Sequence, residues 1–143
     1  MRLLILIILI FFKAPSFGQI SKDTIEFSVY FTECFKSDTL SLVLNNVSIF
    51  KNKIITTDLS DGITNAYLYQ TEKGMWIGQK KVSKLKTKKT LSFSILINGS
   101  LENIEIDLKK GKYILFDKCN NKSNISKHKI FNIAQRQMQP EFD

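Results

Sequence analysis

The densest group of side chains in this chain that could do chemistry is basic. Six lysines, and no acidic residue, lie between residues 80 and 89: Lys80, Lys81, Lys84, Lys86, Lys88 and Lys89. If this segment continues a strand, alternate lysines project from one face of it and would attract phosphates or other anions. Lysines on an edge strand also block aggregation of sheets. The sequence favours that role, or that of a solvated loop, over a binding patch.

Nucleic acid is not the partner that the composition favours for this lysine-rich segment. Proteins that read nucleic acid usually combine such charge with arginine and exposed aromatic residues. Beyond residue 18, however, Arg136 is the only arginine. An acidic protein or an anionic surface ligand fits the lysines better.

Trp76, the only tryptophan, faces Tyr67 and Tyr69 across an expected hairpin. A cluster of this kind could stack on a sugar or anchor a protein interface. Packing in the core or on a sheet face is the more common role of such residues. Trp76 therefore joins the lysines as a candidate binding residue.

Catalytic chemistry finds little support in the sequence. His128 is the only histidine, and it has no cysteine or acidic residue within a few positions. One histidine excludes a zinc site built from several histidines of a single chain. Glu105 and Asp107 could in principle act as paired carboxylates, but alternating acids are the expected solvent face of a strand. We expect no enzymatic activity and no cofactor. A hydrolase whose active site is hidden in the sequence is the last of the functions considered.

The segment DLSDG, residues 58–62, could offer oxygen atoms to calcium. It supplies too few of the six to eight oxygens that calcium takes, whereas Asp, Ser and Gly are typical turn formers. We expect a turn here and no metal site.

Cys34 and Cys119 are the only cysteines, 85 positions apart. In an oxidising compartment such a pair is a candidate disulfide, which would stabilise the fold by about 4 kcal/mol. The alternative is two buried free thiols. Their spacing is not that of a metal site.

Residues 1–18 have the layout of a secretory signal peptide. Arg2 precedes an apolar run from Leu3 to Phe12, and Ser16 and Gly18 provide small side chains before a cleavage site at Gln19. The apolar run is too short to span a membrane, although a short membrane anchor is the alternative reading. We expect a secreted or periplasmic protein with no transmembrane segment once the signal is removed.

The remaining 125 residues suffice for one domain, expected over residues 19–134. Residues 135–143 lack periodicity and are expected to form a tail that is flexible or docks through Phe142. Loss of the signal lowers the net charge from +8 to +6, a surplus equal to the six lysines of 80–89. The basic character is therefore local.

Hydrophobic residues alternate with a period of two along most of the chain, which indicates strands. Hairpins are expected around Lys51-Asn52-Lys53, between 63–70 and 75–82, and at Asn98-Gly99, a pair typical of type I′ turns. Residues 90–118 predict three antiparallel strands in a meander, and 128–134 predict an edge strand or a short helix. The fold expected is all-β, an antiparallel sandwich of about eight short strands, with a small barrel as the alternative.

The signal segment, Gln19 and the strand entry LKKGKYILFDK resemble those of small secreted β-proteins of Gram-negative bacteria. Gly111-Lys112-Tyr113 is also similar to the start of a late strand in transthyretin-like, prealbumin-type sandwiches. The resemblance implies an exported sandwich and assigns no functional residue. Together these observations predict a non-enzymatic binding or structural domain acting through a sheet face or edge. The alternative is a binder of an anionic ligand or surface polysaccharide that uses residues 80–89.

Overall fold

The structure is a computed structural model and describes residues 24–119 and 130–142. The signal-like segment 1–18 and His128 lie outside the described residues. The described chain is almost entirely β, with ten strands. In chain order these are β1 (Ile25–Phe31), β2 (Asp38–Leu44), β3 (Val47–Ile55), β4 (Tyr67–Thr71), β5 (Gly74–Ile77), β6 (Lys80–Val82), β7 (Thr90–Ile97), β8 (Ser100–Asp107), β9 (Tyr113–Asp117) and β10 (Asn132–Arg136).

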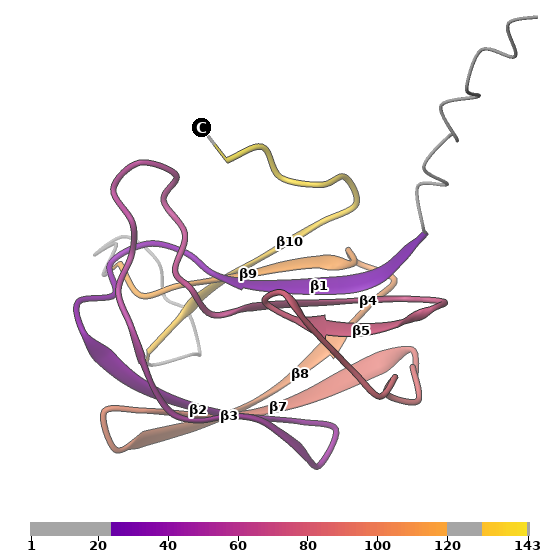
Figure 1. Ribbon diagram of the computed structural model, residues 1–143, viewed down its shortest axis with the longest axis horizontal. Coiled ribbons are helices and arrows are strands. Elements are labelled where there is room, and N and C mark those ends of the chain that lie inside the picture. The colour runs from indigo at the N-terminus through magenta and orange to yellow at the C-terminus, as the bar shows by residue number, and fades with distance from the viewer. Residues whose placement is uncertain (1–23, 120–129, 143) are drawn as a thin grey trace, which may run out of the picture.

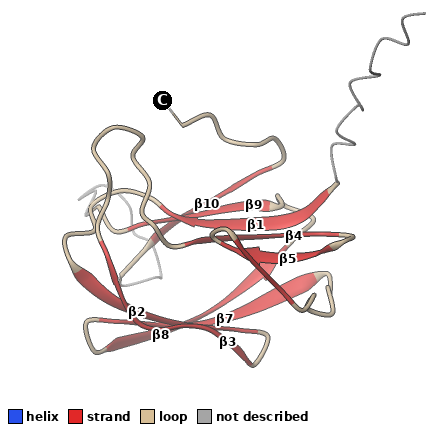
Figure 2. Ribbon diagram, viewed as in Figure 1, coloured by secondary structure: helices blue, strands red, loops and turns tan. Residues whose placement is uncertain are grey.

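The strands form two sheets packed face to face, which confirms the expected all-β sandwich (Figures 1 and 2). One sheet has six strands in the order β10-β9-β1-β4-β5-β6, and the other has four in the order β3-β2-β7-β8. The sheets do not close into a barrel. Among the described strands, β1 and β9 form a parallel pair and every other pair is antiparallel.

Alternation along each strand decides which side chains enter the core. In β1, Phe27, Val29 and Phe31 are fully buried. Phenylalanine rings then link the two sheets, because Phe93 of β7 meets Phe116 of β9 with centroids 5.4 Å apart. The buried aromatic cluster at this end of the core consists of Phe31, Phe35, Phe93, Phe116 and Phe131.

One hairpin turn follows the sequence expectation, and a second has the same backbone form. Asn98 and Gly99 adopt φ of 47° and 81° between β7 and β8, so the predicted turn is confirmed. Asn45 and Asn46, with φ of 48° and 65°, close β2 and β3 in the same way. Both central residues of a type I′ turn need positive φ, and asparagine and glycine tolerate it best.

The hairpin expected around Lys51-Asn52-Lys53 is wrong, since β3 runs through these residues as one strand. Asn52 has a φ of 50°, and its amide donates to the Ser41 hydroxyl at 2.9 Å. The pairing of β2 with β3 shifts at this point, as it does in a β-bulge. A bulge and a turn share the same preference for asparagine, so the residue type did not separate them.

The hairpin between 63–70 and 75–82 is confirmed as β4 and β5, although its second arm divides at Gly78 into β5 and β6. The three-stranded meander over 90–118 is wrong in its last strand. β7 and β8 pair as expected, but β9 crosses to the other sheet and lies between β1 and β10. Gly111 allows this crossing, because a Cβ there would lie 2.6 Å from the backbone nitrogen of Arg136.

Residues 132–136 form an edge strand, as one of the two readings of 128–134 predicts. β10 pairs with β9 and continues to Arg136. Beyond it, the Phe142 ring contacts Tyr30 with centroids 5.0 Å apart.

Two links lie near the end of β9, one within the six-stranded sheet and one between the two sheets. Cys34, after β1, and Cys119, after β9, form a disulfide with Cα atoms 5.2 Å apart. Asp38, at the start of β2, is 3% exposed and accepts a hydrogen bond from Lys118 at 2.6 Å. This ion pair connects the four-stranded sheet to the residue that follows β9. Burial raises the pKa of Asp38, but hydrogen bonds from Lys118, the Lys36 amide and Asn98 outweigh it and hold the pKa below its ordinary value.

The double change Cys34→Ser and Cys119→Ser should lower the free energy of unfolding by about 4 kcal/mol, because the unfolded chain regains the freedom of a long loop. Urea denaturation of the variant and of the oxidised and reduced parent measures the effect. A midpoint that neither the reductant nor the substitution moves would contradict the disulfide.

Asp38→Asn should destabilise the protein at neutral pH by about 1–3 kcal/mol, since it leaves Lys118 without its buried partner. The stability that Asp38 contributes is fully present above its unfolded pKa of about 4 and is lost as the pH falls through its lower folded pKa. The variant should therefore lose less stability than the parent on acidification. Glu105→Gln, on an exposed strand position, is the matched control and should leave the acid-induced loss of stability unchanged in denaturation curves measured at several pH values.

Candidate functional site

The outer face of the six-stranded sheet carries a row of paired side chains across all six strands, and the two in its middle, Ser28 and Tyr113, are buried. Paired residues on neighbouring strands share a face of the sheet. The recorded pairs join Lys81 to Trp76, Trp76 to Tyr69, Tyr69 to Ser28, Ser28 to Tyr113 and Tyr113 to Arg136. We call these six residues the aromatic row: Lys81, Trp76, Tyr69, Ser28, Tyr113 and Arg136.

At the β6 end of the row, three side chains stack on one another. The Tyr69 and Trp76 rings are nearly parallel, with an interplanar angle of 5° and centroids 5.2 Å apart. The Lys81 ammonium lies 5.2 Å from the centroid of the Trp76 ring. Gly74 leaves room for this arrangement, because a Cβ there would lie 2.7 Å from the Lys81 side chain. Tyr69 and Lys81 therefore flank the Trp76 ring, and the stack presents ring edges and polar tips to solvent.

The other end of the row is also basic. Arg136 is exposed and opposite Tyr113, and the Lys112 ammonium lies 5.6 Å from the centroid of the Tyr113 ring. In the part of the chain that the structure describes, neither Lys81 nor Arg136 forms an ion pair. A cation thus stands at each end of the row.

A second pair of rings lies beside the row. Tyr30 of β1 and Tyr67 of β4 are stacked with centroids 6.4 Å apart, and Phe142 covers Tyr30. Burial raises the pKa of Tyr30, and the nearby hydroxyls of Tyr113, Tyr67 and Tyr69 add to the effect. The Tyr30 phenol is therefore a protonated hydrogen-bond donor at neutral pH.

A hollow of about 520 Å³ adjoins this pair over β9 and β10. The C-terminal residues 140–142 form one wall, and the β3–β4 connection, residues 59–62, forms another. Both segments rise above the six-stranded sheet (Figure 1). Four carboxylates and one arginine line the hollow: Glu33, Asp61, Asp117, Glu141 and Arg136.

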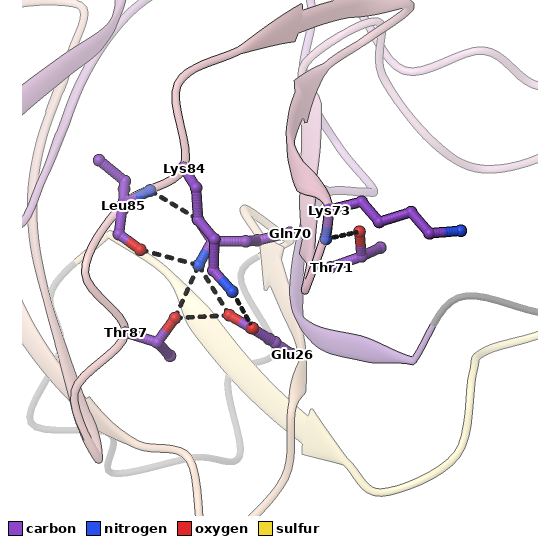
Figure 3. Close-up of polar contacts among 7 residues, drawn as sticks. All are labelled: Glu26, Gln70, Thr71, Lys73, Lys84, Leu85 and Thr87. Carbon is purple, nitrogen blue, oxygen red and sulfur yellow. Dashed lines mark hydrogen bonds and ion pairs between the residues drawn. The ribbon is translucent and has the colours of Figure 1, made fainter.

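The lysine-rich segment is not a continuous strand. β6 ends at Val82, and the chain then passes over an end of the core, where Leu85 is buried. Gln70, which is fully buried on the inner face of β4, binds the backbone of Leu85. The Gln70 side-chain oxygen accepts a hydrogen bond from the Leu85 amide at 2.8 Å, and the Gln70 side-chain nitrogen donates one to the Leu85 carbonyl at 3.0 Å. Figure 3 shows that the Gln70 amide meets Leu85, Thr87 and Glu26 at once. We call residues 83–89, held in this way, the closing loop.

Lys84 is part of this network, since it forms an ion pair with Glu26 (Figure 3). Burial raises the pKa of Glu26, but hydrogen bonds from Lys84, Thr87 and Gln70 outweigh this effect. The pKa of Glu26 therefore lies below its ordinary value. Lys84 is thus engaged in closing the sandwich. The other lysines of the segment are exposed: Lys80, Lys81, Lys86, Lys88 and Lys89.

The turn at residues 58–62 and the two cysteines have structural roles. Ser60 donates to Asp58 through both its amide and its hydroxyl, which lowers the pKa of Asp58 and stabilises the predicted turn. Cys34, Asp117 and Cys119 form the one metal-like group in the described ranges, but its two sulfurs are bonded to each other. The group therefore offers no thiolate to a metal.

The structure brings together some predicted residues and adds others. Trp76 and Tyr69 meet as predicted across their hairpin, and Lys81 joins them. Tyr113 and Arg136 were not expected there, because they lie far along the chain and arrive only through the pairing of β1 with β9. Gln70 was missed as a structural residue, although the sequence carried a sign of its burial. It lies two positions after Leu68 in a strand, which puts both side chains on the inner face.

Comparison with protein-family models, with curated proteins and with solved structures finds no match for this chain. Across residues 24–119 and 130–142, no helix has the length and apolar character to cross a membrane.

Gln70→Leu should release the closing loop, because the Leu85 backbone and Glu26 lose their shared partner. Trypsin, which cuts after lysine, should then cleave between residues 84 and 89 several times faster than in the parent. Gln79→Leu, at an exposed turn position, is the matched control and should cut at the parental rate. Mass spectrometry of the early fragments locates the cuts, and equal rates for both variants would contradict the proposed anchoring.

Proposed function

We propose that the protein is a non-enzymatic binding domain that holds its partner on the accessible end of the aromatic row, formed by Tyr69, Trp76 and Lys81. The observation that carries this proposal is the gathering of aromatic residues on one face. All four tyrosines and the only tryptophan of the chain lie on the outer face of the six-stranded sheet. The outer face of the other sheet carries serine, aliphatic and acidic side chains, among them Ser94, Leu96 and Glu105.

Residues of these types supply most of the energy in protein recognition sites. Tyrosine and tryptophan offer a rigid apolar ring with one polar atom, and arginine offers several donors in a fixed plane. Tyr69 and Trp76 are partly exposed, so their outer edges are accessible to a partner. The row is held by backbone pairing on every strand, so little order has to be gained on binding.

We place this activity outside the cytoplasm. The signal-like layout of residues 1–18 supports export, and the disulfide between Cys34 and Cys119 is the kind of bond that persists in oxidising compartments.

A second candidate function is binding of an anionic ligand by the lysine-rich segment. The exposure of Lys80, Lys86, Lys88 and Lys89 favours it. The engagement of Lys84 with Glu26 removes one of the charges on which it depended. The aromatic row combines cations with aromatic contacts, so we rank it first.

An array of immobilised glycans and peptides, probed with the labelled protein, tests the first proposal. Ligands retained by the parent should bind about tenfold or more weakly to Tyr69→Ser and Trp76→Ser, since central aromatic contacts dominate recognition. Val43→Ser and Leu96→Ser, on the outer face of the four-stranded sheet, are the controls and should bind as the parent does. Thermal unfolding confirms that each variant is folded. Ligands that lose affinity only in the controls would contradict the proposal.

A further inference from the structure

Two groups of opposite charge lie at opposite edges of the six-stranded sheet. The lysine-rich segment 80–89 starts in β6, one edge strand, whereas the hollow lies over β9 and β10, at the other edge. Four carboxylates face one guanidinium in the hollow, which is therefore negative overall. Five strand spacings separate β6 from β10, about 24 Å at the usual distance between strands. Salt at about 0.1 M screens exposed charges beyond about 10 Å, so the two groups do not neutralise each other within one molecule.

The positive group is accessible and its backbone is fixed. Four lysines of the segment are exposed and form no ion pair within residues 24–119 and 130–142: Lys80, Lys86, Lys88 and Lys89. Gln70 binds the backbone of Leu85, which anchors the closing loop that carries three of these lysines. Little backbone freedom is then lost when the lysines bind a partner.

The negative group lines a recess that suits lysine side chains. The hollow has a volume of about 520 Å³, and residues 59–62 and 140–142 rise on two sides of it (Figure 1). In the described part of the chain, none of its four carboxylates forms an ion pair. Leu115 of β9, Ala134 of β10 and Phe142 add apolar surface to the lining. A lysine can lay its aliphatic stem on such a surface while its ammonium reaches a carboxylate.

We propose that the hollow binds the lysine-rich segment of a second copy of this protein. Lysines of the neighbouring copy pair with Glu33 and Glu141, which are the exposed carboxylates of the hollow, and their stems lie on Leu115 and Ala134. The charge complementarity of the two groups favours a second copy as the partner, because each molecule carries both halves of the contact.

The contact joins two different surfaces, so each pair of copies retains one free hollow and one free lysine-rich segment. Further copies can then add head to tail. The rings of Tyr69 and Trp76 take no part in the contact. The inference therefore goes beyond the proposed binding face and does not depend on it.

Sedimentation velocity at low and high salt tests this contact. The parent should associate at low salt, increasingly so as its concentration rises, and its association should weaken about tenfold or more at high salt because salt screens the charges. A lysine variant, Lys86→Ser combined with Lys88→Ser, should associate about tenfold or more weakly than the parent. A carboxylate variant, Glu33→Gln combined with Glu141→Gln, should show the same loss.

Matched controls remove the same charges from other exposed positions. Lys51→Ser combined with Lys110→Ser is the control for the lysine variant, and Glu72→Gln combined with Glu105→Gln is the control for the carboxylate variant. Both should associate within about twofold of the parent, since isolated surface charges contribute little.

A mixture of the lysine variant and the carboxylate variant gives the most specific result. The lysine variant keeps an intact hollow, and the carboxylate variant keeps intact lysines, so one complete contact can form between them. The mixture should give one-to-one pairs that do not grow further, at concentrations where each variant alone is monomeric.

The outcomes separate this inference from the proposed function. A parent that stays monomeric at low salt, or variants that fail to pair in the mixture, would overturn the contact and leave the binding face untouched. Association lost in Tyr69→Ser but kept in both charge variants would overturn it as well and assign the self-contact to the binding face. Binding of polylysine by a monomeric parent, lost in the carboxylate variant, would replace the second copy with a basic protein as the occupant of the hollow.

Discussion

The position of β1 between β4 and β9 is the constraint on which the rest of the structure depends. Because Phe27, Val29 and Phe31 fill the core, Ser28 and Tyr30 must point outward. The register of β1 with its two neighbours then decides which side chains stand beside Ser28. A slip of one residue in either pairing would turn the outward side chains into the core, so burial of the phenylalanines and alignment of the aromatic row are the same requirement.

The basic segment shows how one structural need can account for a pattern that suggests function. At one end of the sandwich, Leu85 of the closing loop is buried in the same core cluster as Leu68, beside Gln70. Covering it with backbone requires hydrogen-bond partners for the Leu85 amide and carbonyl, and Gln70 supplies both. Glu26 and Lys84 then satisfy the rest of the network. Part of the charge near residue 84 thus serves closure, whereas Lys81 contributes to the aromatic row.

The local alternation of hydrophobic residues predicted the strands and most of the turns. It could not predict which strands pair when they lie far apart in the sequence. The alternation of 90–97 and 101–108 and the Asn98-Gly99 turn specify one hairpin completely. The residues near Gly111 do not indicate that the next strand joins the opposite sheet. Its position depends on the parallel pairing with β1, which lies more than eighty positions earlier. For the same reason Trp76 and Tyr69 could be placed together, whereas Arg136 could not. Asn52 shows the remaining ambiguity, since its positive φ occurs in bulges as well as in turns.

The central claim is that β1 aligns Tyr69 and Tyr113 on either side of Ser28. Nuclear Overhauser effects between backbone protons test it directly in solution. The account predicts cross-strand contacts from Ser28 to Tyr69 in an antiparallel pattern and from Ser28 to Tyr113 in a parallel pattern. Contacts from Ser28 to Leu68 or Ile114 as its direct partners would show a register shifted by one residue, which would dismantle the row and contradict the account.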